Sequence, residues 1–398
     1  MYPKMRYRRF GRTELRMPVL TCGGMRFQHG WSDVEPAAIP PESQANVENA
    51  IRHALELGMN HIETARGYGT SEMQLGRILP SIPRDQIIVQ TKVAPMATEK
   101  EFLDTFDKSM KYLGLDSVDL FSLHGINNDA VFDMAMKKGG SLEAARKLQA
   151  QGRVRFIGFS THAPWRVVLR TVATGEFDYV NLHWYFVYDL NWPAIREATR
   201  RDMGVFIISP NDKGGKLYEP PAKLARLCEP LSPMIFNDLY CLARPEVHTL
   251  SIGAARPSDF DEHIRALEYY GQAAAASAPV EQRLRAEMES VLGAGWREKW
   301  TQGIPEYTET PGQINLLEIL RLWAFAKSLD MVEFGKMRYN LLGNAGHWFP
   351  GKNAAQWDRA AIVDAVRESP FASRIPEILE EAHALLAGEE LKRLSESD

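Results

Sequence analysis

The sequence predicts a (β/α)8 barrel followed by a helical C-terminal domain. Eight short apolar runs recur over roughly the first 260 residues, and most are separated by amphipathic stretches. The runs are rich in β-branched and aromatic residues and almost continuously apolar, as expected of strands buried on both faces. Strands that alternate with helices form parallel sheets through right-handed crossovers, and eight such units match a closed barrel.

The expected strands are, in chain order, residues 19–24, 60–64, 86–91, 117–123, 154–159, 179–182, 205–208 and 248–252. A doubly wound open sheet is the competing fold. It usually has fewer units, and no Gly-x-Gly-x-x-Gly turn follows the first expected strand. Residues 5–10 alternate in polarity before Gly11, which predicts a hairpin that closes the bottom of the barrel.

The expected helices show apolar residues at helical spacing. In residues 42–57 the apolar positions fall on one face, and Gly58 ends the pattern. Residues 141–149 begin with Ser141, a candidate N-cap. Further helices are expected at residues 104–113, 165–172 and 195–201.

The chain changes character after the last expected strand. From about residue 285 the strand signals vanish. Five tryptophans gather there, at positions 296, 300, 323, 348 and 357. Because so many aromatic side chains need burial, we expect two domains: a barrel over residues 1–280 and a helical domain over residues 285–398.

Composition argues against several classes of function. The net charge of -4 favours neither nucleic acid nor an anionic membrane surface as a partner. The cysteines are Cys22, Cys228 and Cys241, whose spacing fits neither a disulfide framework nor a metal site. No apolar run of about 18 residues occurs, and the first residues lack an apolar stretch. We therefore expect no membrane span, no signal peptide and a cytoplasmic location.

Four polar residues lie at or just after the ends of consecutive expected strands. Glu63 lies at the end of the second strand and Tyr68 follows it, while Lys92 follows the third strand and His124 the fourth. Because a barrel presents its strand ends at one rim, these side chains are expected to converge.

That combination suits carbonyl reduction. A lysine ammonium lowers the pKa of a nearby tyrosine, a buried carboxylate holds the lysine, and a histidine orients the substrate oxygen. Each residue alone also has a structural explanation: Glu63, for example, could pair with Arg66.

These motifs resemble the aldo-keto reductase family. The resemblance rests on Ile62-Glu63-Thr64-Ala65-Arg66-Gly67-Tyr68-Gly69-Thr70-Ser71-Glu72, Gln90-Thr91-Lys92, Leu120-Phe121-Ser122-Leu123-His124 and Gly152-Arg153-Val154-Arg155-Phe156-Ile157-Gly158-Phe159-Ser160. It spans about residues 5 to 270. It implies that Tyr68 is the proton donor, that Lys92 lowers its pKa and that His124 orients the carbonyl. Glu63 stands where the family has aspartate.

The resemblance also implies nicotinamide contacts. Ser160 matches a serine that holds the carboxamide, while Thr161 replaces an asparagine and Asn181 a glutamine. Ile208 replaces an aromatic residue that often stacks on the nicotinamide ring. A pyrophosphate-covering loop is implied at Ser209, Gly214, Gly215 and Leu217.

The implied adenosine site follows the last strand. It includes Gly253, Arg256 and Glu262, the last of which matches an adenine contact. Asp259 lies near the place where many members carry an arginine for the 2′-phosphate, so Arg256 is the candidate substitute. We expect NADP as the cofactor, with NAD as the alternative.

The C-terminal residues resemble a subgroup of the family that appends a ferredoxin-like helical unit. The frame persists in Pro311-Gly312-Gln313-Ile314-Asn315 and in Pro370 with Ile375-Pro376-Glu377-Ile378-Leu379. Thr310 and Ser369 precede the two prolines, and no cysteine follows Cys241. Iron–sulfur clusters need thiolate ligands, so we expect none here.

Two functions remain open at this stage. The first is an NAD(P)H-dependent reductase acting on a small carbonyl substrate. The alternative is a cofactor-binding redox sensor or partner module with little turnover. An iron–sulfur electron-transfer enzyme conflicts with the number of cysteines, and a protein partner for the C-terminal domain is left open.

Overall fold

A closed barrel of eight parallel strands forms the centre of the first structural unit. The computed structural model describes residues 2–396. The barrel strands are β3 Leu20–Gly23, β4 His61–Glu63, β5 Ile88–Val93, β6 Val118–His124, β7 Val154–Ser160, β8 Tyr179–Leu182, β9 Gly204–Ile207 and β10 Thr249–Gly253. Each pairs with the next, and β10 closes the ring onto β3. The predicted barrel is confirmed, and its strands fall on all eight expected runs.

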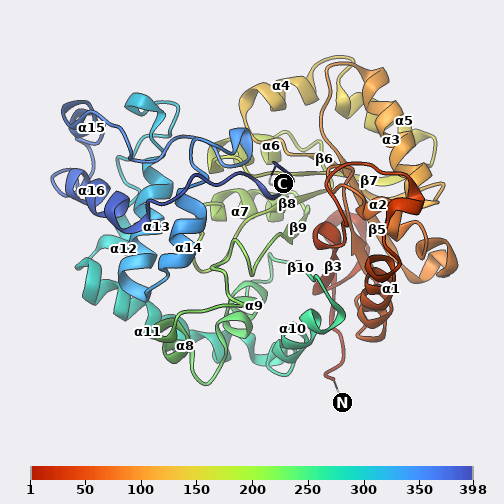
Figure 1. Ribbon diagram of the computed structural model, residues 1–398, viewed down its shortest axis with the longest axis horizontal. Coiled ribbons are helices and arrows are strands. Elements are labelled where there is room, and N and C mark those ends of the chain that lie inside the picture. Colours follow the sequence, from red (N-terminus) through yellow and green to blue (C-terminus); the bar gives the residue numbers. More distant parts are fainter. Residues whose placement is uncertain (1, 397–398) are drawn as a thin grey trace. The chain divides into compact units, whose positions relative to one another are not determined.

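Helices surround the barrel, as Figure 1 shows. They are α1 Pro41–Glu56, α2 Ser71–Leu75, α3 Glu99–Leu113, α4 Asp129–Met136, α5 Ser141–Ala150, α6 Trp165–Ala173, α7 Trp192–Arg200 and α10 Asp261–Ala266. Helix α1 buries Val47, Ala50, Ile51 and Ala54, the predicted apolar face. The predicted Ser141 cap is wrong: Gly140 is the N-cap of α5, and the Ser141 hydroxyl instead accepts a hydrogen bond from Met96 N (3.1 Å).

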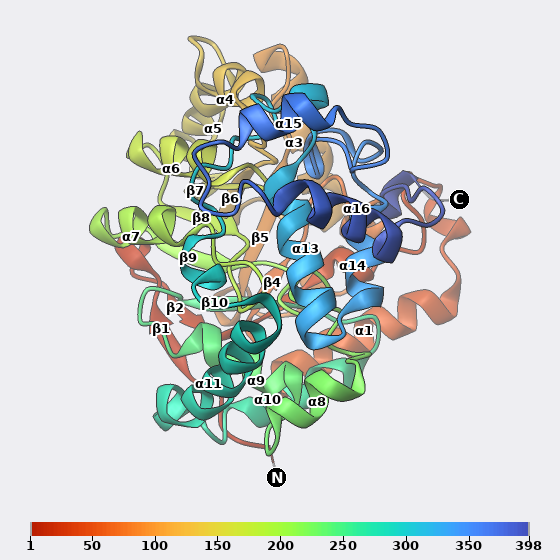
Figure 2. The ribbon, with the colours of Figure 1, turned by 90° about the vertical axis from the view of Figure 1, so that its left-hand side faces the viewer.

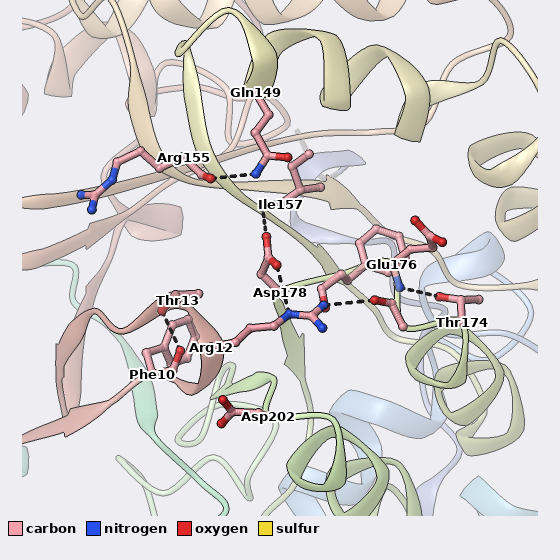
Figure 3. Close-up of polar contacts among 12 residues, drawn as sticks. Phe10, Arg12, Thr13, Gln149, Arg155, Ile157, Thr174, Glu176, Asp178 and Asp202 are labelled. Carbon is pink, nitrogen blue, oxygen red and sulfur yellow. Dashed lines mark hydrogen bonds and ion pairs between the residues drawn. The ribbon is translucent and has the colours of Figure 1, made fainter.

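The bottom of the barrel is closed by the expected hairpin. Its strands are β1 Tyr7–Arg9 and β2 Arg16–Pro18, which pair antiparallel. Arg12 from this hairpin contacts Asp178 (3.1 Å) and the Gly175 carbonyl (3.1 Å), while Asp178 accepts from Ile157 N (2.9 Å; Figure 3). A buried apolar cluster lies on this side and consists of Phe10, Met17, Ile88, Leu120, Tyr179 and Phe206. The polar residues at the carboxyl ends of the strands therefore lie at the opposite rim of the barrel.

A second unit is helical. It comprises Gly215–Phe236 and the chain from Ala275 onward, whereas the first unit comprises the chain up to Gly214 and Asn237–Ala274. The helices within it are α8 Ala222–Cys228, α12 Trp296–Lys299, α13 Leu316–Leu329, α14 Val332–Tyr339, α15 Arg359–Ala365 and α16 Ile375–Leu386. The division falls within α9 Pro233–Leu242 and near the start of α11 Ala273–Leu292.

The core of the second unit is formed by α13, α14 and α16, which pack side by side (Figure 2). Trp296 and Trp323 are buried, with ring centroids 5.3 Å apart. Trp300, Trp348 and Trp357 are partly exposed, so two of the five tryptophans carry most of the expected burial. Within the described part of the chain, no helix is both long and apolar enough to cross a membrane.

Candidate active site

The four predicted catalytic residues meet at the C-terminal rim of the barrel. Glu63 ends β4, Lys92 lies near the end of β5, and His124 ends β6. Tyr68 lies on the loop between β4 and α2 and reaches Lys92. The convergence follows from the barrel itself, because parallel strands present their carboxyl ends on one side.

Lys92 is the centre of this group. Its ammonium contacts the Glu63 carboxylate and donates to the Thr64 carbonyl (2.9 Å) and to Tyr68 Oη (3.2 Å). Lys92 is 1% exposed and Glu63 3%. A buried charge pair of this kind is tolerated only when its partners are well placed. Arg66, the other candidate partner of Glu63, instead pairs with Asp33 and with Glu72 (2.5 Å).

Burial shifts the pKa values of both Tyr68 and Lys92. It raises the pKa of Tyr68, so the phenol keeps its proton at neutral pH. Burial also lowers the pKa of Lys92, while the contact with Glu63 favours its charged form. The ammonium therefore stands where it would stabilise a phenolate formed after proton donation.

His124 faces the same phenol. The rings of Tyr68 and His124 are edge-on, with centroids 5.6 Å apart and an interplanar angle of 86°. Gly67 lies against His124, since a Cβ there would be 3.6 Å from the imidazole. A donor from the histidine and a donor from the tyrosine can therefore converge on one substrate oxygen.

A buried ionic network fixes the loop that carries Tyr68. Glu72 accepts hydrogen bonds from Arg66 (2.5 Å) and from the Thr91 hydroxyl (2.6 Å). Gly69 has φ +55° and lies so close to Gly30 that a Cβ would be 2.0 Å from its carbonyl oxygen. The network was not predicted as such, although Arg66 and Glu72 both stand in the motif that carries the family resemblance.

The predicted nicotinamide residues lie on neighbouring strands. Ser160 pairs in register with His124 on one side and with Asn181 on the other. Asn181 Oδ1 accepts from Gln90 (3.3 Å), whereas its buried Nδ2 has no hydrogen-bond partner among the described residues. The Thr161 hydroxyl donates to the Ile126 carbonyl (2.7 Å) and accepts from Ala163 N (3.0 Å). Asn181 thus offers a donor at the rim, while the Thr161 hydroxyl is engaged by its own loop.

The loop after β9 crosses the mouth of the barrel. Asp212 contacts Arg26 (3.7 Å), which follows β3, and Lys213 lies 3.2 Å from Nδ1 of His162, which follows β7. These two strands are opposite each other in the ring of eight. The same loop includes the predicted Ser209 and Gly214. No local sequence pattern indicated these long-range contacts.

The two adjacent glycines of this loop, Gly214 and Gly215, belong to different structural units. Gly214 is required by a tight turn, because a Cβ there would be 1.6 Å from the Pro210 carbonyl oxygen. The predicted Gly215 and Leu217 belong to the second unit. Their assignment to the cofactor site remains a prediction.

The predicted adenosine residues surround the end of β10. Gly253 ends this strand, and Glu262 lies in the first turn of α10. Asp259 accepts from Ala255 N (2.9 Å) and from Arg256 Nε (2.9 Å). The Arg256 side chain is 74% exposed, so its terminal nitrogens face solvent.

Part of the sequence is similar to known reductases. Residues 19–184 match the aldo/keto reductase family. L-glyceraldehyde 3-phosphate reductase of Escherichia coli is 27% identical over 181 residues, which cover 42% of this chain and 48% of the relative. The 9,11-endoperoxide prostaglandin H2 reductase of Trypanosoma cruzi is 32% identical over 154 residues, covering 38% of this chain and 46% of the relative. The chain thus matches about half the length of these relatives.

Solved structures show the same fold. The holo form of an aldo-keto reductase from Bacillus halodurans has a TM-score of 0.57 and 20% identity, covering 70% of this chain and 96% of its own. An aldo-keto reductase from Klebsiella pneumoniae, solved in complex with NADPH, has a TM-score of 0.55, 16% identity and coverage of 70% and 96%. At this identity the likeness concerns the barrel architecture alone.

Proposed function

We propose that the protein is an NAD(P)H-dependent reductase that converts an aldehyde or ketone to an alcohol, with Tyr68 as the proton donor. The observation that carries the proposal is the buried Lys92 ammonium, 3.2 Å from Tyr68 Oη and in contact with Glu63. The family match over residues 19–184 and the reductases among the relatives support the same reaction class.

The chain's own residues handle the proton and the substrate oxygen. Tyr68 donates its phenolic proton to the oxygen as negative charge develops there. Lys92 stabilises the resulting phenolate, and Glu63 keeps the ammonium charged and in place. His124 hydrogen-bonds the same oxygen and orients the carbonyl.

A nicotinamide cofactor suits the donors at this rim. When bound, the reduced nicotinamide supplies the hydride that completes the two-electron reduction. The unpartnered Nδ2 of Asn181 and the hydroxyl of Ser160 would hold a carboxamide. Ser209 and Gly214 are proposed to cover the pyrophosphate, with Gly253 and Glu262 near the adenosine; the family resemblance extends the pyrophosphate loop to Gly215 and Leu217. Thr161 would shape this site through its loop.

The proposal favours NADP over NAD. The Arg256 guanidinium is exposed, and Asp259 holds it through Nε (2.9 Å), which leaves the terminal nitrogens to meet a 2′-phosphate. The proposed substrate is a small carbonyl compound, and the proposed location is the cytoplasm.

We also propose that residues from about 285 onward form a ferredoxin-like domain without iron–sulfur clusters. The residues that precede the two prolines of the frame, where the resemblance would place cluster cysteines, make local hydrogen bonds: the Thr310 hydroxyl donates to the Glu306 carbonyl (3.0 Å), and Ser369 Oγ accepts from Phe371 N (3.2 Å). Trp296 packs on Phe371, with ring centroids 4.7 Å apart. Aromatic burial would offset the lost cross-links, and a protein partner is proposed to bind this domain.

One experiment separates the reductase from a cofactor sensor. The full chain is titrated with NADPH and NADH by fluorescence, and turnover is then measured on a panel of aliphatic and aromatic aldehydes and ketones. The proposal expects saturable binding together with NADPH consumption and alcohol formation. Tight cofactor binding without turnover on any carbonyl would favour the sensor.

A further inference from the structure

Glu63 meets a second polar group besides Lys92. Ser251 Oγ on β10 donates to Glu63 Oε2 at 3.4 Å, and Ser251 is itself buried. The two carboxylate oxygens are therefore divided between the ammonium on one side and a hydroxyl on the other. A buried carboxylate needs such partners to offset the loss of water.

The contact crosses an entire strand. β3 lies between β10 and β4, so these two strands are separated by two strand spacings, about 9–10 Å across the sheet, and Ser251 lies two residues before Gly253, the register partner of Gly23. The side chains meet only because Gly23 of β3 leaves the space between them open. A Cβ at Gly23 would stand 2.6 Å from Ser251 Oγ and would displace the hydroxyl.

The distance from Glu63 across β3 to Ser251 explains why a glutamate suits position 63. An aspartate is shorter by one methylene, a loss of reach of about 1.3 Å. From the same backbone position, an aspartate that reached Lys92 would fall short of Ser251. The longer acid, the glycine on the intervening strand and the serine beyond it thus form one matched set.

We infer that Ser251 is a positioning residue for the reaction, which acts across Gly23 to hold the Glu63 carboxylate against Lys92. The inference rests on the proposed function, because Lys92 acts through Tyr68 in that proposal. The Ser251 hydroxyl donates to Glu63 and acts on the phenol only through the Glu63–Lys92 pair. Its role is to keep the carboxylate, and through it the ammonium, in one geometry.

A double-mutant cycle tests the role in catalysis. Four proteins are compared: the unmodified chain, Ser251→Ala, Glu63→Asp and the double variant. Loss of a hydrogen bond to a buried charge should lower kcat about tenfold in Ser251→Ala. KM for the aldehyde and Kd for NADPH should stay within about twofold. In the Glu63→Asp background the serine has already lost its partner, so Ser251→Ala should change kcat by less than about twofold.

A matched control lies on the same strand. Thr249 is buried two residues earlier on β10, and its hydroxyl contacts Thr21 (2.8 Å). Thr249→Val should keep kcat within about twofold of the unmodified chain, even if stability falls. Equal losses of kcat in Ser251→Ala and Thr249→Val, or additive losses in the cycle, would overturn the positioning role.

A measurement that needs no activity tests the contact itself. Urea unfolding midpoints are recorded for the same four proteins. Ser251→Ala should lower the midpoint when Glu63 is present and leave it unchanged in the Glu63→Asp background. If the unmodified chain reduces no carbonyl, the proposed function fails while this cycle still decides the contact. An equal midpoint shift for Ser251→Ala in both backgrounds would refute the contact between Ser251 and Glu63.

Discussion

Replacement of Lys92 by methionine tests the buried ion pair most severely. Methionine fills similar space but leaves the Glu63 carboxylate without its ammonium, inside a site where both residues are almost fully buried. Breaking a buried pair by removing one partner typically costs about 3–5 kcal/mol. We therefore expect Lys92→Met to lower the free energy of unfolding by that amount.

The double variant Lys92→Met/Glu63→Gln separates charge from packing. It removes both charges and keeps the approximate shapes, so most of the lost stability should return. Lys108→Met is the control, because the Lys108–Asp33 pair (2.5 Å) involves a half-exposed lysine and should contribute about 1 kcal/mol or less.

Urea unfolding at pH 7 provides the measurement. With a slope of about 3 kcal/mol per M, the single variant should shift the midpoint by about 1–2 M. A double variant that is as unstable as Lys92→Met would contradict the reasoning, because the loss would then come from packing. So would a shift for Lys92→Met no larger than that for Lys108→Met.

Three further predictions concern pH, the cofactor and the second unit. Burial lowers the pKa of His61 to about 3, so the unfolded chain binds a proton that the barrel excludes. The free energy of unfolding should fall as pH drops from about 6.5 towards 3, and His61→Gln should flatten this slope; an unchanged slope would exclude His61 as its source. Because Arg256 is largely exposed, Arg256→Ala should weaken NADPH binding only about three- to tenfold and leave NADH binding unchanged, whereas equal losses for both would indicate a packing role. The purified chain should show no absorbance near 400 nm and no iron, and the residues after about 285 should resist proteolysis as a folded unit does; stoichiometric iron or rapid digestion would refute the cluster-free domain.

The barrel could be predicted because its signals are local. Each strand is a short apolar run, and polar residues that follow such runs must gather at one rim whatever the details of packing. Glu63, Lys92 and His124 were found in this way. Tyr68 follows the second run on a loop, so the sequence predicts the rim at which it lies but not the course that brings it to Lys92.

The starts of helices are harder to predict, because several residues can serve as the N-cap and tertiary contacts decide among them. The helix expected from residue 104 begins at Glu99, where Thr98 and Glu101 form a capping box. Ser141 was a plausible cap by type, but the hydroxyl is engaged by Met96 N, a residue far away in sequence. Local propensity cannot weigh such a tertiary contact.

Contacts between distant strands were invisible from the sequence. Ser251 reaches Glu63 only because Gly23 lies between them, which requires the strand order and register to be known. The division of the chain also departs from a single cut, since Gly215–Phe236 groups with the C-terminal helices. The predicted boundary between two domains near residue 280 stays a prediction.

In the proposed function, Tyr68 donates the proton in an NAD(P)H-dependent carbonyl reduction. The most direct test is the kcat of Tyr68→Phe on the best aldehyde of the panel, measured beside its Kd for NADPH. We expect a Kd within about threefold of that of the unmodified chain and a loss of kcat of about 10²–10⁴-fold, because the phenyl ring keeps the packing and lacks the phenolic proton. A Tyr68→Phe variant that turns over with near-unmodified kcat would contradict this role of Tyr68.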